Sequence, residues 1–248
     1  MVKDDRKESV TLEKKRRSLK PGALTAPIPP AMVTVGDSEH YNVLTVAWTG
    51  ILATVPPKTY ISVRPSRHSH AILCEKREFV INLPSADMAR TVDFVGIYTG
   101  AKMDKFERCA LTAHPSEKVS APTIGECPIA LECRVTEIIP MGSHDVFIAD
   151  IVSVSCREDI MDSEGKMHFE RANLLAYAHG EYYALGERLG RFGFSTDKEK
   201  TKKNDSIKKD APVKEPFYQK VAVKSSSAKK KTDKNKGAPH GKRRGSAK

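Results

Sequence analysis

The segment from Arg64 to Ser69 carries side chains that suit anion chemistry, because two arginines and two serines occur there within six residues. Pro65 ends a β-rich run, and Ser66 or Ser69 is expected to cap a short helix that continues through A-I-L-C-E-K-R. A helix N-terminus offers unpaired N–H groups and about half a positive charge. A helix start with two guanidinium groups and two hydroxyls beside it is suited to a phosphate, so this segment predicts a phosphate site. The alternative is a surface loop with two solvated arginines.

A run of small side chains precedes this segment. From Leu44 to Trp48, large apolar residues alternate with small ones, which is the period of a half-buried strand with a packed face and a small face. Small side chains let backbone groups approach a flat ligand closely. The small residues are Thr45, Ala47, Thr49 and Gly50. A phosphate site beside them suggests a phosphorylated planar cofactor.

Similar alternation elsewhere predicts the elements that position these residues. Strands are expected at Ala31–Val35, Leu44–Trp48, Tyr60–Val63, Phe79–Leu83, Pro128–Ile139, Val146–Cys156, Leu174–Tyr177 and Tyr182–Leu185. Ser85 is expected to cap a helix that buries Met88, Val92 and Val95 along one stripe. The chain is therefore predicted to be mainly β, with a few short helices.

Six short motifs occur in a recognisable order. They are N-x-x-T-x-A-W from Asn42, P-P-x-x-x-x-S-V-R before Pro65, E-F-V-I-N-L-P from Glu78, G-A-K-M-D-K-F at 100–106, P-I-A-L-E-C at 128–133 and G-S-H at 142–144. Over about Leu19 to Ser195 the chain resembles the flavin reductase-like, FMN-binding split-barrel family, most closely its flavoredoxin branch. The resemblance implies an antiparallel Greek-key β-barrel that binds FMN, usually at a homodimer interface.

The resemblance also implies functional residues. The cofactor-binding candidates are Asn42, Thr45, Val46, Ala47, Trp48, Thr49, Ser62, Arg64, Ser66, Arg67, His68, Ser69, Asn82, Leu83, Lys102 and Lys105. Lys102 is the first choice for a lysine near the pyrimidine edge of the flavin, where it would raise the reduction potential. His144 is the catalytic candidate, able to orient a nicotinamide or donate a proton. Without the resemblance, the simpler interpretation of these lysines and this histidine is that they are solvated surface residues. Tyr177 is expected to pack.

Composition divides the chain into three parts: a charged arm at residues 1–20, the barrel domain at 21–195 and a tail at 196–248. The tail holds 18 Lys or Arg against 6 Asp or Glu, whereas Pro21–Ser195 has a net charge of −5. The tail has few apolar residues to bury, and their burial cannot offset the entropy lost on ordering the chain. We therefore expect the tail to be disordered. Its basic runs are those of a solubilising extension or of a segment that binds nucleic acid or another polyanion.

Cysteine usage and hydropathy indicate the compartment. The five cysteines are irregularly spaced without a C-x-x-C pair, and no apolar run reaches the ~20 residues of a membrane span. We expect reduced thiols, no metal site, no membrane association and a cytoplasmic location, with Cys133 a small core residue. The polar start of the sequence lacks the apolar region of a signal peptide.

Three functions are compatible with these features. The first is an oxidoreductase that moves a hydride or electrons from NADH or NADPH through FMN to free flavin, a redox partner protein or a metal complex. The second is a flavoredoxin-type FMN carrier without NAD(P)H turnover. The third is a nucleic-acid-associated protein that acts through its basic tail. The absence of a P-loop, a G-x-G-x-x-G motif or a nucleophile motif agrees with chemistry done by a flavin.

Overall fold

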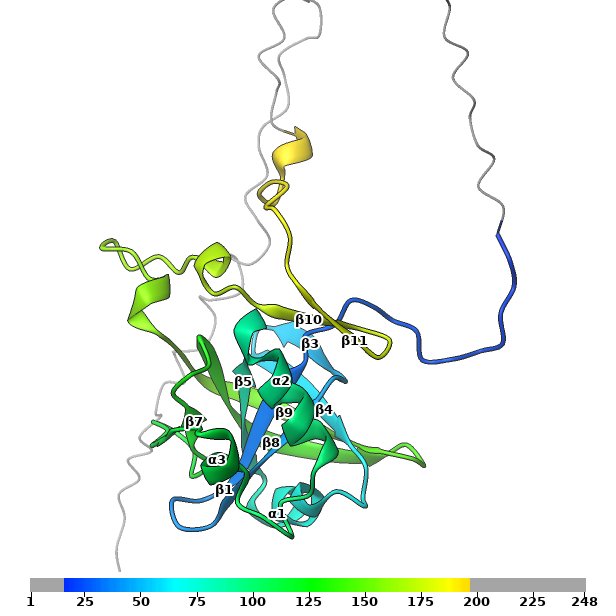
Figure 1. Cartoon of the computed structure of the whole chain (residues 1–248), viewed down its shortest axis with the longest axis vertical. Helices are drawn as coiled ribbons and strands as arrows, with labels where there is room; N and C mark the ends of the chain where they lie inside the picture. The colour runs from blue at the N-terminus through cyan, green and yellow to red at the C-terminus, as the bar shows by residue number, and fades with distance from the viewer. Residues whose placement is uncertain (1–15, 197–248) are drawn as a thin grey trace, which may run out of the picture. The chain divides into compact units, whose positions relative to one another are not determined.

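A computed structural model describes residues 16–196 of the chain. The predicted tail and most of the predicted N-terminal arm lie outside the described residues. The chain divides into two units, Met1–Gly190 and Arg191–Lys248, and the first unit contains the β fold (Figure 1). Among residues 16–196, no helix is both long enough and apolar enough to cross a bilayer.

Strands dominate the first unit, as predicted. They are β1 (Ala31–Gly36), β2 (Tyr41–Val46), β3 (Thr49–Thr54), β4 (Pro57–Val63), β5 (Glu78–Leu83), β6 (Ala113–His114), β7 (Thr123–Ile124), β8 (Ile129–Pro140), β9 (Asp145–Cys156), β10 (Leu175–Ala178) and β11 (Glu181–Ala184). The α-helices are α1 (His68–Lys76), α2 (Ala89–Ile97) and α3 (Lys105–Cys109), and 3₁₀ turns occur at Ala86–Met88, Glu158–Ile160 and Phe169–Arg171. The described part of the second unit contains one 3₁₀ turn, Phe194–Thr196.

Seven strands form one antiparallel sheet in the order β2-β1-β5-β8-β9-β4-β3. The strands β2 and β3 lie at opposite ends of this order, yet only Ala47 and Trp48 separate them in the chain. The Ser62 N–H also donates to the Trp48 carbonyl at 2.9 Å. The sheet therefore curls into the predicted split barrel, with the split between β2 and β4.

One hydrophobic core fills the barrel. It draws alternate residues from six strands, among them Val33, Leu44, Ile61, Phe79, Cys133 and Phe147. These residues are at most 5 % exposed, which confirms the predicted alternation and the core role of Cys133. The prediction for Trp48 is wrong, because β2 ends at Val46 and the indole is 42 % exposed. The two-residue passage into β3 breaks the alternation there.

A second apolar layer covers the outside of β1 and β2. Figure 1 shows α2 lying across the barrel wall, and its residues Val92 and Val95 are fully buried there against Val43. Thr45 points to the same side and donates from Oγ1 to the Val92 carbonyl at 2.6 Å. The predicted small face of β2 is therefore partly covered by α2.

The predicted helix caps are wrong. The N-cap of α1 is Arg67 in an extended conformation, and no side chain there accepts a capping hydrogen bond. The Ser69 hydroxyl instead accepts from Asn42 Nδ2 at 2.7 Å. Ser85 precedes the 3₁₀ turn Ala86–Met88 without a side-chain cap, although the expected stripe on α2 is buried.

Asn82 is fully buried on β5, and its side chain hydrogen-bonds to backbone groups of both β1 and β7. Its Nδ2 donates to the Met32 carbonyl at 3.0 Å, and its Oδ1 accepts from the Ile124 N–H at 2.9 Å. A buried backbone group that loses its partner retains the full cost of leaving water.

We therefore expect Asn82→Leu to lower the free energy of unfolding by about 2–5 kcal/mol, because the Met32 carbonyl and the Ile124 N–H lose their buried hydrogen bonds to the amide. Urea denaturation followed by circular dichroism measures this. The control is Thr136→Val, which removes an exposed hydroxyl from β8 and should change the free energy of unfolding by less than about 0.5 kcal/mol. Equal stability of Asn82→Leu and the parent chain would contradict this role.

Candidate functional site

A groove lies at the split of the barrel, beside the edge of β2 that pairs with no other strand. It consists of two adjoining pockets of about 370 and 330 Å³, which share Leu44, Arg64 and Arg67. We call the first the anion pocket and the second the flat pocket. Their positions place the two arginines at the centre of the groove.

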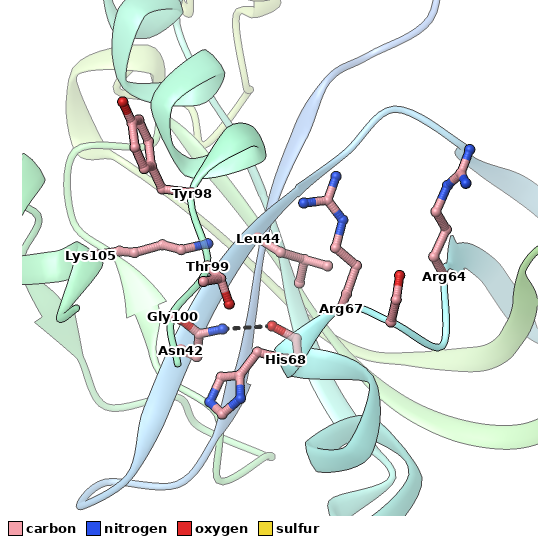
Figure 2. Close-up of a pocket in the computed structure, with 11 residues that line it drawn as sticks. Asn42, Leu44, Arg64, Arg67, His68, Tyr98, Thr99, Gly100 and Lys105 are labelled. Carbon is pink, nitrogen blue, oxygen red and sulfur yellow. Dashed lines mark hydrogen bonds between the residues drawn. The ribbon is translucent and has the colours of Figure 1, made fainter. Parts of the chain in front are cut away.

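The anion pocket is strongly cationic. It is lined by Asn42, Leu44, Arg64, Ser66, Arg67, His68, Ser69, Tyr98, Thr99, Gly100 and Lys105, which include three cations and no carboxylate. Figure 2 shows Lys105 reaching in from one side, with Arg67 on the other side and Arg64 beyond Arg67. The start of α1 completes this end, where a helix favours negative charge.

Local contacts hold the walls of the anion pocket in place. Arg67 donates from Nη1 to the Gly96 carbonyl at the end of α2, at 2.9 Å. The hydrogen bond from Asn42 to Ser69 ties β2 to α1 (Figure 2). Gly100 lies directly against Asn42, where an added Cβ would come within 2.1 Å of Oδ1. A side chain at this position would therefore displace the Asn42 amide that holds Ser69.

Lys105 is buried, with 4 % of its surface exposed. Its Nζ donates to the carbonyls of Val43 and Val95, both at 2.8 Å. Burial, followed by the neighbouring Arg67 charge, lowers the pKa of Lys105 to about 8. An anion beside this ammonium group would favour its charged form, so the pocket is arranged to gain from binding one.

The flat pocket continues along the edge of β2. It is lined by Leu44, Thr45, Val46, Ala47, Trp48, Ser62, Val63, Arg64, Arg67, His144 and Tyr177. Small and apolar residues form most of its wall. No Asp or Glu lines this pocket either.

His144 lies in the flat pocket at the hairpin between β8 and β9. It is 8 % exposed, and its ring centroid is 4.4 Å from that of Trp48. Its Nδ1 is 2.9 Å from the Ser143 hydroxyl. Burial, and then the positive charges of Arg64 and Arg67, lower the pKa of His144, so its imidazole is neutral around neutral pH.

Most of the predicted cofactor-binding residues gather in this groove. Those that line it are Asn42, Thr45, Val46, Ala47, Trp48, Ser62, Arg64, Ser66, Arg67, His68, Ser69 and Lys105, together with His144. No sequence pattern indicated Leu44, Val63, Tyr98 or Thr99 as site residues, and Tyr177 was expected to pack. The T-G pair at 99–100, which opens the G-A-K-M-D-K-F loop, was the available signal for that part of the wall.

Four predicted residues line neither pocket. Lys102 is exposed in the loop before α3, so Lys105 is the lysine that the structure brings to the groove. Asn82 uses its amide for backbone groups, and Leu83 packs between two core clusters. Thr49 donates to the Tyr60 carbonyl at 2.6 Å. Gly50 next to it meets the Tyr60 ring, so this part of the small face contacts protein.

The donor set fits a phosphorylated flavin. A phosphate needs several positive N–H donors without competing carboxylates, and the anion pocket has these. An isoalloxazine ring needs a flat wall of small and apolar residues, and the adjoining pocket offers this along β2. Arg64, Ser66, Arg67 and Lys105 would hold the phosphate, and the residues from Thr45 to Trp48 would lie along the ring system.

Comparison with known proteins agrees with the geometry. Residues 24–186 match the model of the flavin reductase like domain, and the chain belongs to this family. The expected fold and family are thereby confirmed.

The chain is similar to several proteins whose names state a function, and three of them follow with their identity and coverage. A flavoredoxin of Desulfovibrio vulgaris (Miyazaki F) is 32 % identical, with a TM-score of 0.67 over 71 % of this chain and 97 % of its own. An FMN-binding protein from Thermus thermophilus shares the fold at 24 % identity, with a TM-score of 0.61 over 71 % of this chain and 99 % of that one. An NADPH-flavin oxidoreductase of Streptomyces viridifaciens is 26 % identical over 63 % of this chain and 81 % of its own.

Proposed function

We propose that this protein is an FMN-dependent oxidoreductase that takes a hydride from NADH or NADPH and passes electrons to an acceptor. The observation that carries the proposal is the groove itself, in which a cationic pocket without carboxylates adjoins a flat pocket that contains a neutral histidine. Similarity to an NADPH-flavin oxidoreductase supports the choice of donor. When bound, the flavin supplies the hydride and electron chemistry.

The residues of the chain bind and orient the reactants. Arg64, Arg67 and Lys105 neutralise the phosphate, while the start of α1 adds a favourable dipole. Trp48 and His144 limit the space over the flat pocket and can orient a nicotinamide ring against its ligand. Because His144 is neutral, it can accept a hydrogen bond or hold a proton at Nε2 without repelling a cationic nicotinamide.

A flavoredoxin-type carrier is the second candidate. The flavoredoxin of D. vulgaris, at 32 % identity, favours it. Both functions use the same groove, and they differ in whether a pyridine nucleotide reaches it. The role proposed for the basic tail concerns residues outside the described part and stays a prediction.

We also propose that the protein acts as a homodimer. The residues Ile51, Leu52 and Val55, on and just after β3, are 64 %, 49 % and 68 % exposed. An apolar surface of this kind favours association with a partner, and a second copy would cover it.

Anaerobic mixing with NADH or NADPH tests the reductase function. We expect the flavin absorption band of the FMN-loaded protein to bleach in the stopped flow. The His144→Asn variant should bleach about tenfold more slowly at unchanged FMN affinity, because it loses the group that orients the donor. If neither nucleotide bleaches the FMN-loaded protein, it is a carrier and the reductase proposal fails.

The Arg64→Ala/Arg67→Ala double variant tests the phosphate site. It should bind FMN about 100-fold more weakly and riboflavin less than about threefold more weakly, because two charge-assisted hydrogen bonds to phosphate are lost. Fluorescence titration measures both affinities. The control, Arg90→Ala/Arg108→Ala, removes two exposed arginines that line neither pocket and should leave both unchanged. Equal weakening for both flavins would show that the arginines do not contact the phosphate.

The pKa of Lys105, about 8, predicts how FMN binding depends on pH. Below this value the ammonium group is charged and attracts the phosphate, and above it FMN must bind together with a proton. The affinity should therefore fall as pH rises above about 8, by up to tenfold per pH unit. In Lys105→Gln the affinity for FMN should no longer fall with pH. The affinity for riboflavin should not change with pH in either protein. A parallel fall in Lys105→Gln would assign the titration to another group.

A further inference from the structure

Cys74, His70 and Asp145 form a cluster outside the groove, and none of them lines either pocket. His70 and Cys74 lie four residues apart on α1 and therefore share one face of the helix. The Cys74 Sγ is 3.8 Å from His70 Nδ1. The His70 Nε2 is 2.8 Å from Asp145 Oδ2, at the start of β9. A nucleophile, a base and a group that orients the base are thus brought together from two elements.

Asp145 determines which ring nitrogen of His70 faces the thiol as an acceptor. A carboxylate only accepts hydrogen bonds, so the His70 Nε2 must carry the hydrogen in this contact. The Nδ1 lone pair of the neutral ring is then directed at Cys74. The side chains of His70 and Asp145 are 14 % and 19 % exposed, and the Phe147 ring meets the imidazole edge-on at 5.5 Å. The base is therefore held in a fixed orientation.

Cys74 differs from the core cysteines in both access and environment. Its residue is exposed, whereas Cys127 and Cys133 are buried. Burial raises the pKa of the Cys133 thiol to about 12 and that of Cys127 further, so both stay protonated and inert. A reagent can reach Cys74, and a base is beside it to accept the proton.

We propose that Cys74 is a site of reversible thiolation by low-molecular-weight disulfides, with His70 as the general base and Asp145 as its orienting partner. His70 Nδ1 takes the thiol proton, and the sulfur of Cys74 attacks one sulfur of the disulfide. A new S–S bond forms and the original one breaks. The departing thiolate takes the proton from His70. Cys74 is oxidised to a mixed disulfide, and one equivalent of free thiol is released.

The first test compares the same thiol in two states of the full-length chain. Oxidised glutathione is the probe, and mass spectrometry of the Cys74 peptide gives the rate at about pH 7. Folding ordinarily slows the reaction of a thiol with a disulfide, because it restricts access to the sulfur. We expect Cys74 instead to react about tenfold faster in the native protein than in the chain unfolded in urea. A native rate equal to or below the unfolded rate would overturn the proposal without the need for any variant.

The second test assigns the acceleration to its cause. His70→Asn should remove the native acceleration, and Asp145→Asn should reduce it, with circular dichroism reporting that each variant is folded. The control is His40→Asn, which removes an exposed histidine elsewhere and should keep the parent rate. If folded His70→Asn reacts as fast as the parent, the thiol is merely accessible and His70 is not its base. None of these outcomes depends on flavin binding.

Discussion

The passage from β2 to β3 through Ala47 and Trp48 is the constraint on which the rest of the structure depends. Two residues must carry the chain from one end of a seven-stranded sheet to the other, and this is possible only if the sheet curls until its ends meet. The closure cannot be complete at the point of passage. One edge of β2 therefore stays open beside β4, and the groove forms along it.

The charges of the groove follow from what meets at this opening. The segment that leaves β4 carries Arg64 and Arg67 and turns directly into α1, so two cations and a helix start lie at the open edge. Lys105 comes from a distant part of the chain and is held by carbonyls of β2 and α2. Burial, and then the charge of the neighbouring Arg67, lowers the pKa of Lys105. A dianion bound beside Lys105 would favour its charged form, which is the basis of the phosphate site proposed above.

Local patterns were sufficient to predict most of the fold. Alternation identified the main strands because each has one face in the barrel core, and the Arg–Ser segment identified the anion pocket because its side chains act close to where they lie in sequence. The prediction for Trp48 failed because a strand-to-strand passage has no period. The capping prediction for Ser69 failed because α1 already begins at His68, which places Ser69 inside the helix, where its hydroxyl accepts from the distant Asn42.

The choice between Lys102 and Lys105 shows where sequence reasoning ends. Both lysines lie in one loop motif three residues apart, and nothing local distinguishes them. The difference arises from α3, which begins at Lys105 and directs it into the interior, while Lys102 stays on the exposed loop. Asn82 illustrates the same limit, since its amide serves backbone groups of β1 and β7 that alternation could not place beside it.

The most direct test of this account is a crystal structure of the protein grown with FMN. We expect the phosphate to lie in the anion pocket, within hydrogen-bonding distance of Arg67 and Ser66, and the ring system to extend along Thr45 to Trp48 toward His144. A groove without flavin at saturating FMN, or a phosphate bound elsewhere on the molecule, would contradict the account.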